Sequence, residues 1–300
     1  MVHAGAMRFS GTYTALITPF REGAIDTHAY QSLIERQIAG GVDGIVPCGT
    51  TGESPTLDTA EHLEVVRLAV EFAAGRCEVI AGSGANATAE AIDLTAAAEQ
   101  LGVTGTLQVC PYYNKPSQQG LYLHFKTIAE ATRLPVMLYN VPGRSVIEIA
   151  PETVARLAAD CPNIVALKEA GGSVDRVNQL VQVLPEDFAI LCGDDPLTLP
   201  FIACGASGLV SVTSNLIPDV IARLVRACLN GSFDEALILQ KQYYPLMRGL
   251  MSLDVNPVPI KTAVALQGHC TPELRLPLAP MDAASTAKLN TLLESYNLLA

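Results

Sequence analysis

A lysine ends one of the apolar runs of the chain, in the stretch NIVALKEAGG. Ile164 to Leu167 form a run typical of a buried strand, and Lys168 follows it directly. Lysine is seldom buried unless a partner neutralises it or the amine has a chemical task. An amine held among apolar side chains favours its neutral form, which attacks a carbonyl to make a Schiff base. A buried ion pair with a carboxylate is the alternative for Lys168.

Two other polar stretches follow apolar runs and could bind an anion or move a proton. GTTGES, residues 49–54, places glycines and hydroxyl groups in a turn whose N–H groups can converge on a carboxylate. YNVPGR contains the phenol of Tyr139, which could transfer a proton, and the guanidinium of Arg144, which could hold a carboxylate. An ordinary turn, a strand-end aromatic ring and a solvated arginine are the structural alternatives.

No metal or phosphate motif accompanies these residues. The GTTGES turn lacks the GK[ST] of a Walker loop, and no HExxH, CxxC or GxSxG pattern occurs. Asp194 and Asp195 could hold Mg²⁺, but neighbours on a strand point to opposite faces, so a loop cap is the preferred interpretation. The five histidines and eight cysteines are dispersed. We therefore expect chemistry without a metal.

Eight apolar or β-branched runs alternate with helical patterns over the first 230 residues. The runs are nearly continuous in hydrophobicity, as strands buried on both faces are. The expected strands are 12–18, 44–49, 78–84, 105–111, 135–140, 164–170, 188–195 and 208–214. Eight such units in about 220 residues predict a closed (β/α)₈ barrel. The alternative, an open doubly wound sheet, would more often carry a Gly-rich phosphate turn after its first strand.

Active sites of such barrels lie at the carboxyl ends of the strands, so the barrel gathers the candidate side chains at one mouth. Alternation along the strand 164–170 puts Ile164, Ala166 and Lys168 on one face. If that face is the barrel interior, the Lys168 amine lies at the mouth among apolar side chains.

Capping residues predict where helices begin and end. Asp26 can cap a helix that stops at Gly40 or Gly41, and Asp58 with Glu61 forms a capping-box pattern.

After residue 230 the alternation stops and three helices are expected. Ser232 with Glu235 has the spacing of a capping box that opens a helix near 232–250. NPVPIKTAVALQGH and DAASTAKLNTLLESYNLL hold the other two. We expect a barrel over residues 8–230 and a C-terminal helical domain over 231–300, packed on the barrel or on a neighbouring subunit.

Bulk composition indicates a globular protein. Apolar residues make up 49% of the 300 residues, and the net charge of −11 argues against nucleic acid or an anionic membrane as a partner. No run of about 20 apolar residues could span a membrane, and the first residues do not resemble a signal peptide. We expect a cytoplasmic protein with reduced cysteines.

The stretches GTTGES, PYYNKP, YNVPGR, KEA and GLVSV, in this order and each at a strand end, resemble the pyruvate-dependent class I aldolases. This family includes dihydrodipicolinate synthase and N-acetylneuraminate lyase. NPVPIKTAVALQG and LRLPLAPM extend the resemblance into the helical segment and favour the dihydrodipicolinate synthase branch. The resemblance implies a lyase that condenses pyruvate with L-aspartate 4-semialdehyde to 4-hydroxy-tetrahydrodipicolinate, the first committed step of lysine and diaminopimelate biosynthesis.

Two other functions stay open at this point. A sister aldolase would join pyruvate to another aldehyde, such as a sugar acid or the precursor of 4-hydroxy-2-oxoglutarate. A catalytically silent barrel would bind pyruvate or lysine as a sensor. The arginine of YNVPGR favours the aspartate semialdehyde reaction over the first, and the complete set of reactive side chains argues against the second.

The resemblance also implies a role for each candidate residue. Lys168 would form the imine with pyruvate, so no cofactor is needed, and Tyr139 would transfer protons beside it. Thr50 and Tyr113 would complete a proton relay, with Tyr113 reaching in from the adjacent subunit. The substrate contacts would come from Thr51 on the pyruvate carboxylate, from Gly193 and Val210 around the pocket, and from Arg144 on the carboxylate of the second substrate.

The resemblance further implies a homotetramer, a dimer of dimers, and many members bind lysine as an inhibitor at a subunit interface. The matching positions are Ser54, Pro55, Thr59, His62, Asn86, Glu90 and Tyr112. Two departures stand out. Thr59 occupies a position where histidine is frequent, and Ser145–Val146 follow Arg144 where Thr-Gly is common. Because valine avoids the positive φ open to glycine, we expect a shifted loop around Arg144.

Overall fold

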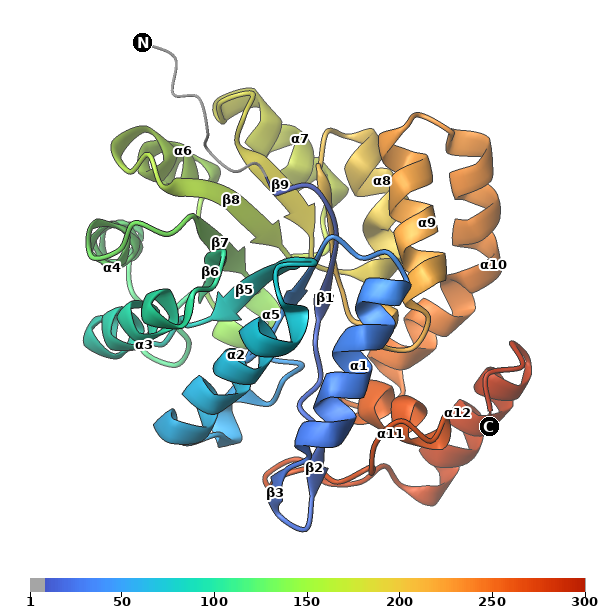
Figure 1. Cartoon of the computed structure of the whole chain (residues 1–300). Helices are drawn as coiled ribbons and strands as arrows, with labels where there is room; N and C mark the ends of the chain where they lie inside the picture. The colour runs from blue at the N-terminus through green and yellow to red at the C-terminus, as the bar shows by residue number, and fades with distance from the viewer. Residues whose placement is uncertain (1–8, 300) are drawn as a thin grey trace.

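Eight parallel strands close into a barrel in the computed structural model, which describes residues 9–299 (Figure 1). The order around the barrel is β1, β10, β9, β8, β7, β6, β5 and β4, and β4 pairs with β1 to close it. The strands are β1 Gly11–Ala15, β4 Gly44–Val46, β5 Glu78–Gly82, β6 Gly105–Val109, β7 Val136–Asn140, β8 Ile164–Glu169, β9 Ala189–Cys192 and β10 Gly208–Ser211. Each overlaps one of the eight apolar runs, so the predicted (β/α)₈ barrel is confirmed.

Helices cover the outside of the barrel (Figure 1). They are α1 Thr27–Ala39, α2 Thr59–Ala73, α3 Thr88–Leu101, α4 Gln118–Glu130, α5 Pro142–Ser145, α6 Pro151–Asp160, α7 Val174–Val183, α8 Thr198–Ala203 and α9 Pro218–Leu229. Short 3₁₀ turns occupy Ser54–Thr56, Asp195–Leu197 and Thr213–Asn215, and a small hairpin joins β2 Phe20–Arg21 to β3 Ala24–Ile25. Within the described residues, no helix is long and apolar enough to cross a membrane.

Two of the predicted caps are confirmed by hydrogen bonds. The Asp26 side chain accepts from the backbone N–H of Ala29 at the start of α1, which ends at Gly40. At the start of α2, Asp58 and Glu61 form both hydrogen bonds of a capping box. These carboxylates satisfy N–H groups that have no partner inside the helix.

Three helices follow the barrel, as expected: α10 Phe233–Ser252, α11 Val258–Leu266 and α12 Ala283–Glu294. The capping box predicted for α10 is wrong, because the Ser232 side chain makes no capping hydrogen bond. Glu235 pairs instead with Arg223 of α9, at 2.6 Å. A guanidinium on the neighbouring helix competes successfully for a carboxylate that the local pattern assigns to the helix start.

The C-terminal helices share one apolar core with the barrel. Leu246 and Leu250 of α10, Ile260 of α11 and Leu289 of α12 are buried in the same cluster as the residues between the barrel strands and their helices. This packing follows one of the two placements expected for the segment. The domain boundary between residues 230 and 231 stays a prediction. The outer limits predicted for the two domains, residues 8 and 300, lie outside the described residues.

A second cluster fills the barrel interior and contains Tyr139, Ala166 and Val210. The prediction that Ile164 shares a face with Ala166 and Lys168 is wrong, because Ile164 belongs to the outer cluster. The pairing of β8 with β7 shifts register after Ile164, which leaves Val165 without a partner. Such an irregularity resets the alternation of side chains, so a rule based on a regular strand misplaces the first residue.

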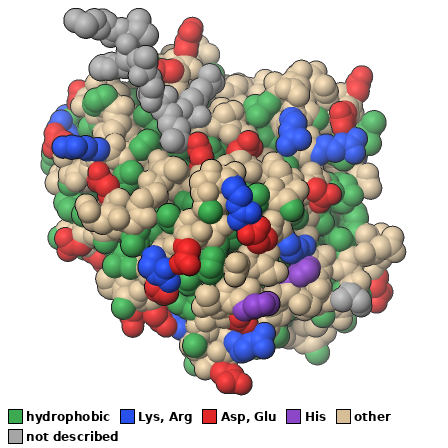
Figure 2. Space-filling model, viewed as in Figure 1, with side chains coloured by type: hydrophobic (Ala, Val, Ile, Leu, Met, Phe, Trp, Pro, Cys, Tyr) green, Lys and Arg blue, Asp and Glu red, His purple; other side chains and the backbone are tan. Residues whose placement is uncertain are grey.

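Charged side chains are spread over the surface. On the face shown in Figure 2, acidic and basic side chains are interspersed among hydrophobic and uncharged ones. Exposed pairs such as Arg76 with Glu35 contribute little to stability, since water screens them. The pairs that organise the molecule are buried.

Candidate active site

Lys168 and Tyr139 are direct neighbours on adjacent strands. Tyr139 of β7 lies opposite Lys168 of β8 in the pairing register. Both side chains are 6% exposed, and the Lys168 Nζ atom lies 4.2 Å from the centroid of the Tyr139 ring. No carboxylate in residues 9–299 lies within 4 Å of this amine, so the ion pair considered for Lys168 is not present there.

The next residue on each strand locks the two strands together. The Asn140 amide donates to both carboxylate oxygens of Glu169, each at 3.0 Å. Glu169 also accepts from Arg176 Nε at 2.7 Å and from the Gly171 N–H at 2.6 Å. Glu169 is a fully buried carboxylate whose oxygens are satisfied, and it holds β7 and β8 in the register that pairs Tyr139 with Lys168.

Gly193 leaves the space that the lysine side chain occupies. A Cβ atom at this position would lie 2.7 Å from the Cβ of Ala170 and 3.2 Å from the Cε of Lys168. The Gly193 N–H donates to the carbonyl of Glu169 at 2.8 Å, which brings β9 close to β8. Val210, 1% exposed, belongs to the interior cluster that includes Tyr139.

Asp195 caps the loop that follows β10. Its carboxylate accepts hydrogen bonds from the Ser211 hydroxyl and from the N–H groups of Val212 and Thr213. Burial raises the pKa of Asp195, while these hydrogen bonds and the positive charge of Lys168 lower it. In residues 9–299, no group of three or more His, Cys, Asp or Glu side chains has the arrangement of a metal site. The loop-cap interpretation of Asp195 therefore accounts for its contacts.

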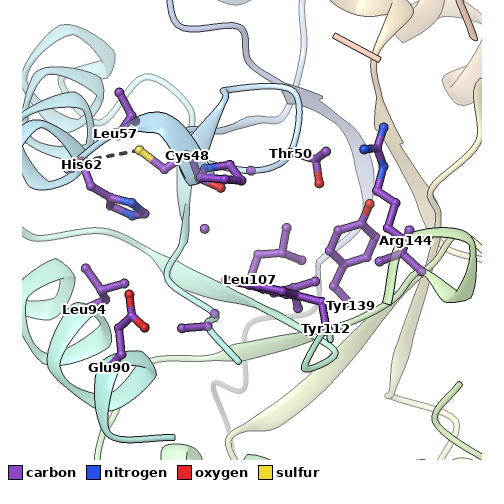
Figure 3. Close-up of a pocket in the computed structure, with 18 of the residues that line it drawn as sticks. Cys48, Thr50, Leu57, His62, Glu90, Leu94, Leu107, Tyr112, Tyr139 and Arg144 are labelled. Carbon is purple, nitrogen blue, oxygen red and sulfur yellow. Dashed lines mark hydrogen bonds between the residues drawn. The ribbon is translucent and has the colours of Figure 1, made fainter. Parts of the chain in front are cut away.

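A cavity of about 410 Å³ opens at the carboxyl ends of β4 to β7. Thr50, Tyr139 and Arg144 line one end, and the Tyr139 hydroxyl points toward the other two (Figure 3). His62 and Glu90 lie at the opposite end. The cavity thus brings together three predicted active-site residues and six residues of the predicted lysine site, which are Ser54, Pro55, Thr59, His62, Glu90 and Tyr112.

The GTTGES turn has the properties of an anion site. Its backbone closes tightly, because the Gly52 N–H donates to the Gly49 carbonyl and the Glu53 N–H to the Thr50 carbonyl. The N–H groups of Thr50 and Thr51 donate to no acceptor in the described part of the chain. Thr51 itself is buried, and its hydroxyl oxygen accepts from the Asn256 amide at 3.0 Å. Two free N–H groups and a hydroxyl suit a carboxylate.

A buried ion pair lies beneath this turn. The Glu53 carboxylate contacts the Lys261 amine at 2.6 Å, and both side chains are fully buried. The second Glu53 oxygen accepts from the Arg275 N–H at 3.1 Å. Burial lowers the pKa of Lys261, and the charge of Glu53 raises it. This pair was not predicted from the sequence, although a lysine among apolar residues in NPVPIKTAVAL was a usable signal.

Arg144 lies on α5 and reaches the cavity, with one guanidinium nitrogen donating to the Asn256 carbonyl at 2.9 Å. The premise that valine avoids a positive φ does not hold at Val146, while the expected shift of the loop relative to other family members stays a prediction. Val146 adopts φ +65°, and its N–H closes α5 by donating to the Pro142 carbonyl. The loop keeps the left-handed conformation, which costs a β-branched residue on the order of 1–2 kcal/mol.

Tyr113, which was predicted for the proton relay, lies away from the cavity of its own chain. Its side chain is 89% exposed and does not line the cavity. Its backbone has a φ of +72°. Within the described residues no hydrogen bond joins Thr50 to Tyr139 either, so the proton relay stays a prediction.

The far end of the cavity combines a neutral imidazole with an acid. Burial lowers the pKa of His62, and its Nε2 atom has no partner in residues 9–299. Glu90 is exposed at the start of α3. Burial raises the pKa of Tyr112, and the Glu90 charge raises it further. Asn86 supports this end, because its amide donates to the Tyr112 carbonyl at 3.2 Å.

Comparison with known proteins agrees with this geometry. Residues 8–296 match the model of the dihydrodipicolinate synthetase family. The chain belongs to this family. A 4-hydroxy-tetrahydrodipicolinate synthase of Endomicrobium trichonymphae is 48% identical over 291 residues, which cover 97% of this chain and 99% of the relative.

Solved structures of the family superpose closely. The dihydrodipicolinate synthase of Aquifex aeolicus has a TM-score of 0.96 at 47% identity, covering 97% of this chain and 99% of its own. The enzyme of Cyanidioschyzon merolae, solved with lysine bound, has a TM-score of 0.94 at 42% identity, with 97% and 99% coverage. Membership of the family therefore extends over both the barrel and the C-terminal helices.

Proposed function

We propose that this protein condenses pyruvate with L-aspartate 4-semialdehyde to give 4-hydroxy-tetrahydrodipicolinate, as a lyase of lysine and diaminopimelate biosynthesis. The relatives that bear this enzyme name match the chain over almost its whole length. The observation that carries the proposed chemistry is the pairing of Lys168 with Tyr139: within the described residues the amine has no carboxylate partner, and the neighbouring phenol lines the cavity. The eight cysteines, all free, fit a reducing cytoplasm, which fractionation of cells would test.

The first half of the reaction joins pyruvate to the protein. The neutral Lys168 amine attacks the ketone carbon of pyruvate, and Tyr139 passes a proton to the oxygen that leaves as water. The pyruvate carboxylate accepts from the free N–H groups of Thr50 and Thr51 and from the Thr51 hydroxyl. The imine then draws electrons from the methyl group, which loses a proton to the Tyr139 oxygen and becomes an enamine carbon. No cofactor is required, since the protonated imine is the electron sink.

The second half joins the aldehyde and releases the amine. The enamine carbon attacks the aldehyde carbon of the semialdehyde, and the Tyr139 phenol supplies the proton for the new hydroxyl. Arg144, which has no carboxylate within 4 Å in residues 9–299, holds the carboxylate of this substrate. The amino group of the substrate then attacks the imine carbon, displaces Lys168 and closes the ring. One water is released overall.

Borohydride reduction tests the covalent step. With pyruvate present, we expect the intact protein to gain one stable adduct on Lys168, located by peptide mass spectrometry, because reduction fixes the imine. Lys168→Ala removes the adduct and lowers turnover by at least about a thousandfold. Lys126→Ala, which removes an amine of α4 outside the cavity, keeps both. An adduct of equal yield in Lys168→Ala would falsify the mechanism.

Substitution of Arg144 tests the identity of the aldehyde. Arg144→Met removes the positive charge, so we expect KM for aspartate semialdehyde to rise by roughly 10- to 100-fold. Arg144→Lys keeps the charge but loses the planar guanidinium, so we expect a smaller rise in this KM. Pyruvate trapping stays unchanged in both, because Arg144 acts on the second substrate. A panel of aldehydes is the comparison: turnover of a sugar-acid aldehyde above that of the semialdehyde would favour the sister aldolase.

The exposed Tyr113 supports an assembly in which a neighbouring chain completes each site, in a homotetramer built as a dimer of dimers. Mixing two inactive variants tests this. Chains with Lys168→Ala supply Tyr113, and chains with Tyr113→Phe supply Lys168, so co-expression restores one site in each mixed pair. We expect up to roughly a quarter of the unmodified activity. No recovery, with mixed assemblies confirmed by mass, contradicts the shared site, and sedimentation reports the number of chains.

A second ligand is supported by the far end of the cavity, where we propose that L-lysine binds as an inhibitor. Glu90 offers a carboxylate for an ammonium group, whereas Thr59, at a position where histidine is frequent in the family, departs from the lysine-binding pattern. We expect L-lysine to lower activity and norleucine, which lacks the side-chain ammonium, to have no effect. Glu90→Gln removes the inhibition, whereas Asp93→Asn on the same helix keeps it. Activity that is constant across a lysine titration rejects the site.

A further inference from the structure

Asn256 contacts two segments that follow different strands of the barrel: the GTTGES turn after β4, and α5 after β7. It belongs to the segment between α10 and α11 and is 8% exposed. Its side-chain amide donates to the Thr51 hydroxyl oxygen at 3.0 Å, across 205 residues of sequence. Its main-chain carbonyl accepts from the Arg144 guanidinium at 2.9 Å. One residue of the C-terminal helices therefore contacts both groups that the proposed reaction uses to hold carboxylates.

The bond to Thr51 sets the direction of a proton. A hydroxyl group has one hydrogen to donate and two lone pairs to accept with. Because the Asn256 amide occupies an acceptor side of the Thr51 oxygen, the hydroxyl hydrogen stays free for a substrate carboxylate. The Asn256 Oδ1 atom has no partner in the described residues, so Thr51 is the only described hydrogen-bond partner of this buried side chain.

The bond to Arg144 restrains a side chain that is otherwise exposed. Arg144 carries five N–H donors in a planar fork, and the Asn256 carbonyl uses one nitrogen. Among the described residues the remaining donors have no acceptor, and the side chain lines the cavity. Fixing one end of a long side chain before the substrate arrives lowers the entropy lost on binding.

Asn256 does not itself line the cavity, so it contacts the two groups from behind. Its position is held independently, because α11 begins two residues later and Lys261 of that helix pairs with Glu53. Glu53 is two residues after Thr51 in the same turn. The segment that carries Asn256 is thereby anchored to the turn that Asn256 orients.

We infer that Asn256 is a positioning residue that aligns Thr51 and Arg144, the groups for the two substrate carboxylates, in a single arrangement. The inference rests on the proposed function. It assigns to the C-terminal helices a direct part in substrate binding, beyond covering the barrel. Asn256 acts on pyruvate through Thr51 alone, so its side chain has no effect where the Thr51 hydroxyl is absent.

A set of paired substitutions tests this dependence. Asn256→Ala removes the amide and keeps the main-chain carbonyl for Arg144. We expect KM for pyruvate, and the pyruvate concentration that gives half-maximal borohydride trapping, to rise by roughly tenfold, with kcat changed less than threefold. In a Thr51→Ser background, which keeps a hydroxyl, the same rise appears. In a Thr51→Val background, Asn256→Ala adds nothing.

Two further variants keep the test decisive. Asn290→Ala makes the same change on α12, away from the cavity, and leaves KM unchanged. Asn256→Asp has the same shape but cannot donate, so its carboxylate takes the Thr51 hydrogen and raises KM for pyruvate above the Asn256→Ala value. This variant replaces Asn256→Ala if thermal melting shows that the alanine variant fails to fold.

Several outcomes overturn the inference. The first is a rise in KM for pyruvate from Asn256→Ala in the Thr51→Val background that equals the rise in the unmodified background. The second is an unchanged KM in both Asn256 variants. The third is a loss of kcat alone, in step with a lowered melting temperature. The failure of the proposed function is separate and visible beforehand, because it is the absence of a pyruvate adduct in the unmodified protein.

Discussion

The buried ion pair between Glu53 and Lys261 is the interaction on which the arrangement of the site depends. Moving a carboxylate and an ammonium out of water costs several kcal/mol for each, and close contact with further hydrogen bonds is needed to offset it. The pair meets this condition at 2.6 Å, with the Arg275 N–H on the second oxygen. Neither partner can move away without leaving a charge unpaired in the core, at a cost of about 3–5 kcal/mol. The GTTGES turn and α11 are therefore held as one unit, and Asn256 reaches Thr51 because of it.

A second buried carboxylate has the matching role on the other side of the mouth. Glu169 fixes β7 against β8 through Asn140 and Arg176, so the amine and the phenol keep their separation without touching the charges that hold them. The reactive side chains thus point into the barrel, while the next residue on each strand points outward into a polar network. Alternation along a strand lets adjacent residues serve reactivity and rigidity.

Much of this molecule could be predicted from the sequence, because hydrophobic runs and strand-end motifs report local structure directly. The eight strands, the caps at Asp26 and Asp58 and the gathering of Thr50, Tyr139 and Arg144 at one mouth followed from such patterns. The failures were tertiary. The register shift after Ile164 and the capture of Glu235 by Arg223 each depend on a neighbour that no short window contains. The side-chain contacts of Asn256 with Thr51 and of Lys261 with Glu53 span more than 200 residues, and the exposed Tyr113 side chain has no hydrogen-bond partner among the described residues.

One cavity holds both the proposed substrate site and the proposed lysine site, so substitutions in its shared walls affect both. Leu107 and Tyr112 lie between the two ends and form walls common to both (Figure 3). A substitution there that widens the pocket for a different aldehyde also reshapes the surroundings of His62 and Glu90. Under the proposed assignment of the two ends, substrate choice and inhibition by lysine are therefore not separately inherited traits. A substitution that changes substrate preference is expected to change inhibition by lysine as well, unless it is confined to a residue proposed for one site alone, such as Arg144 or Thr59.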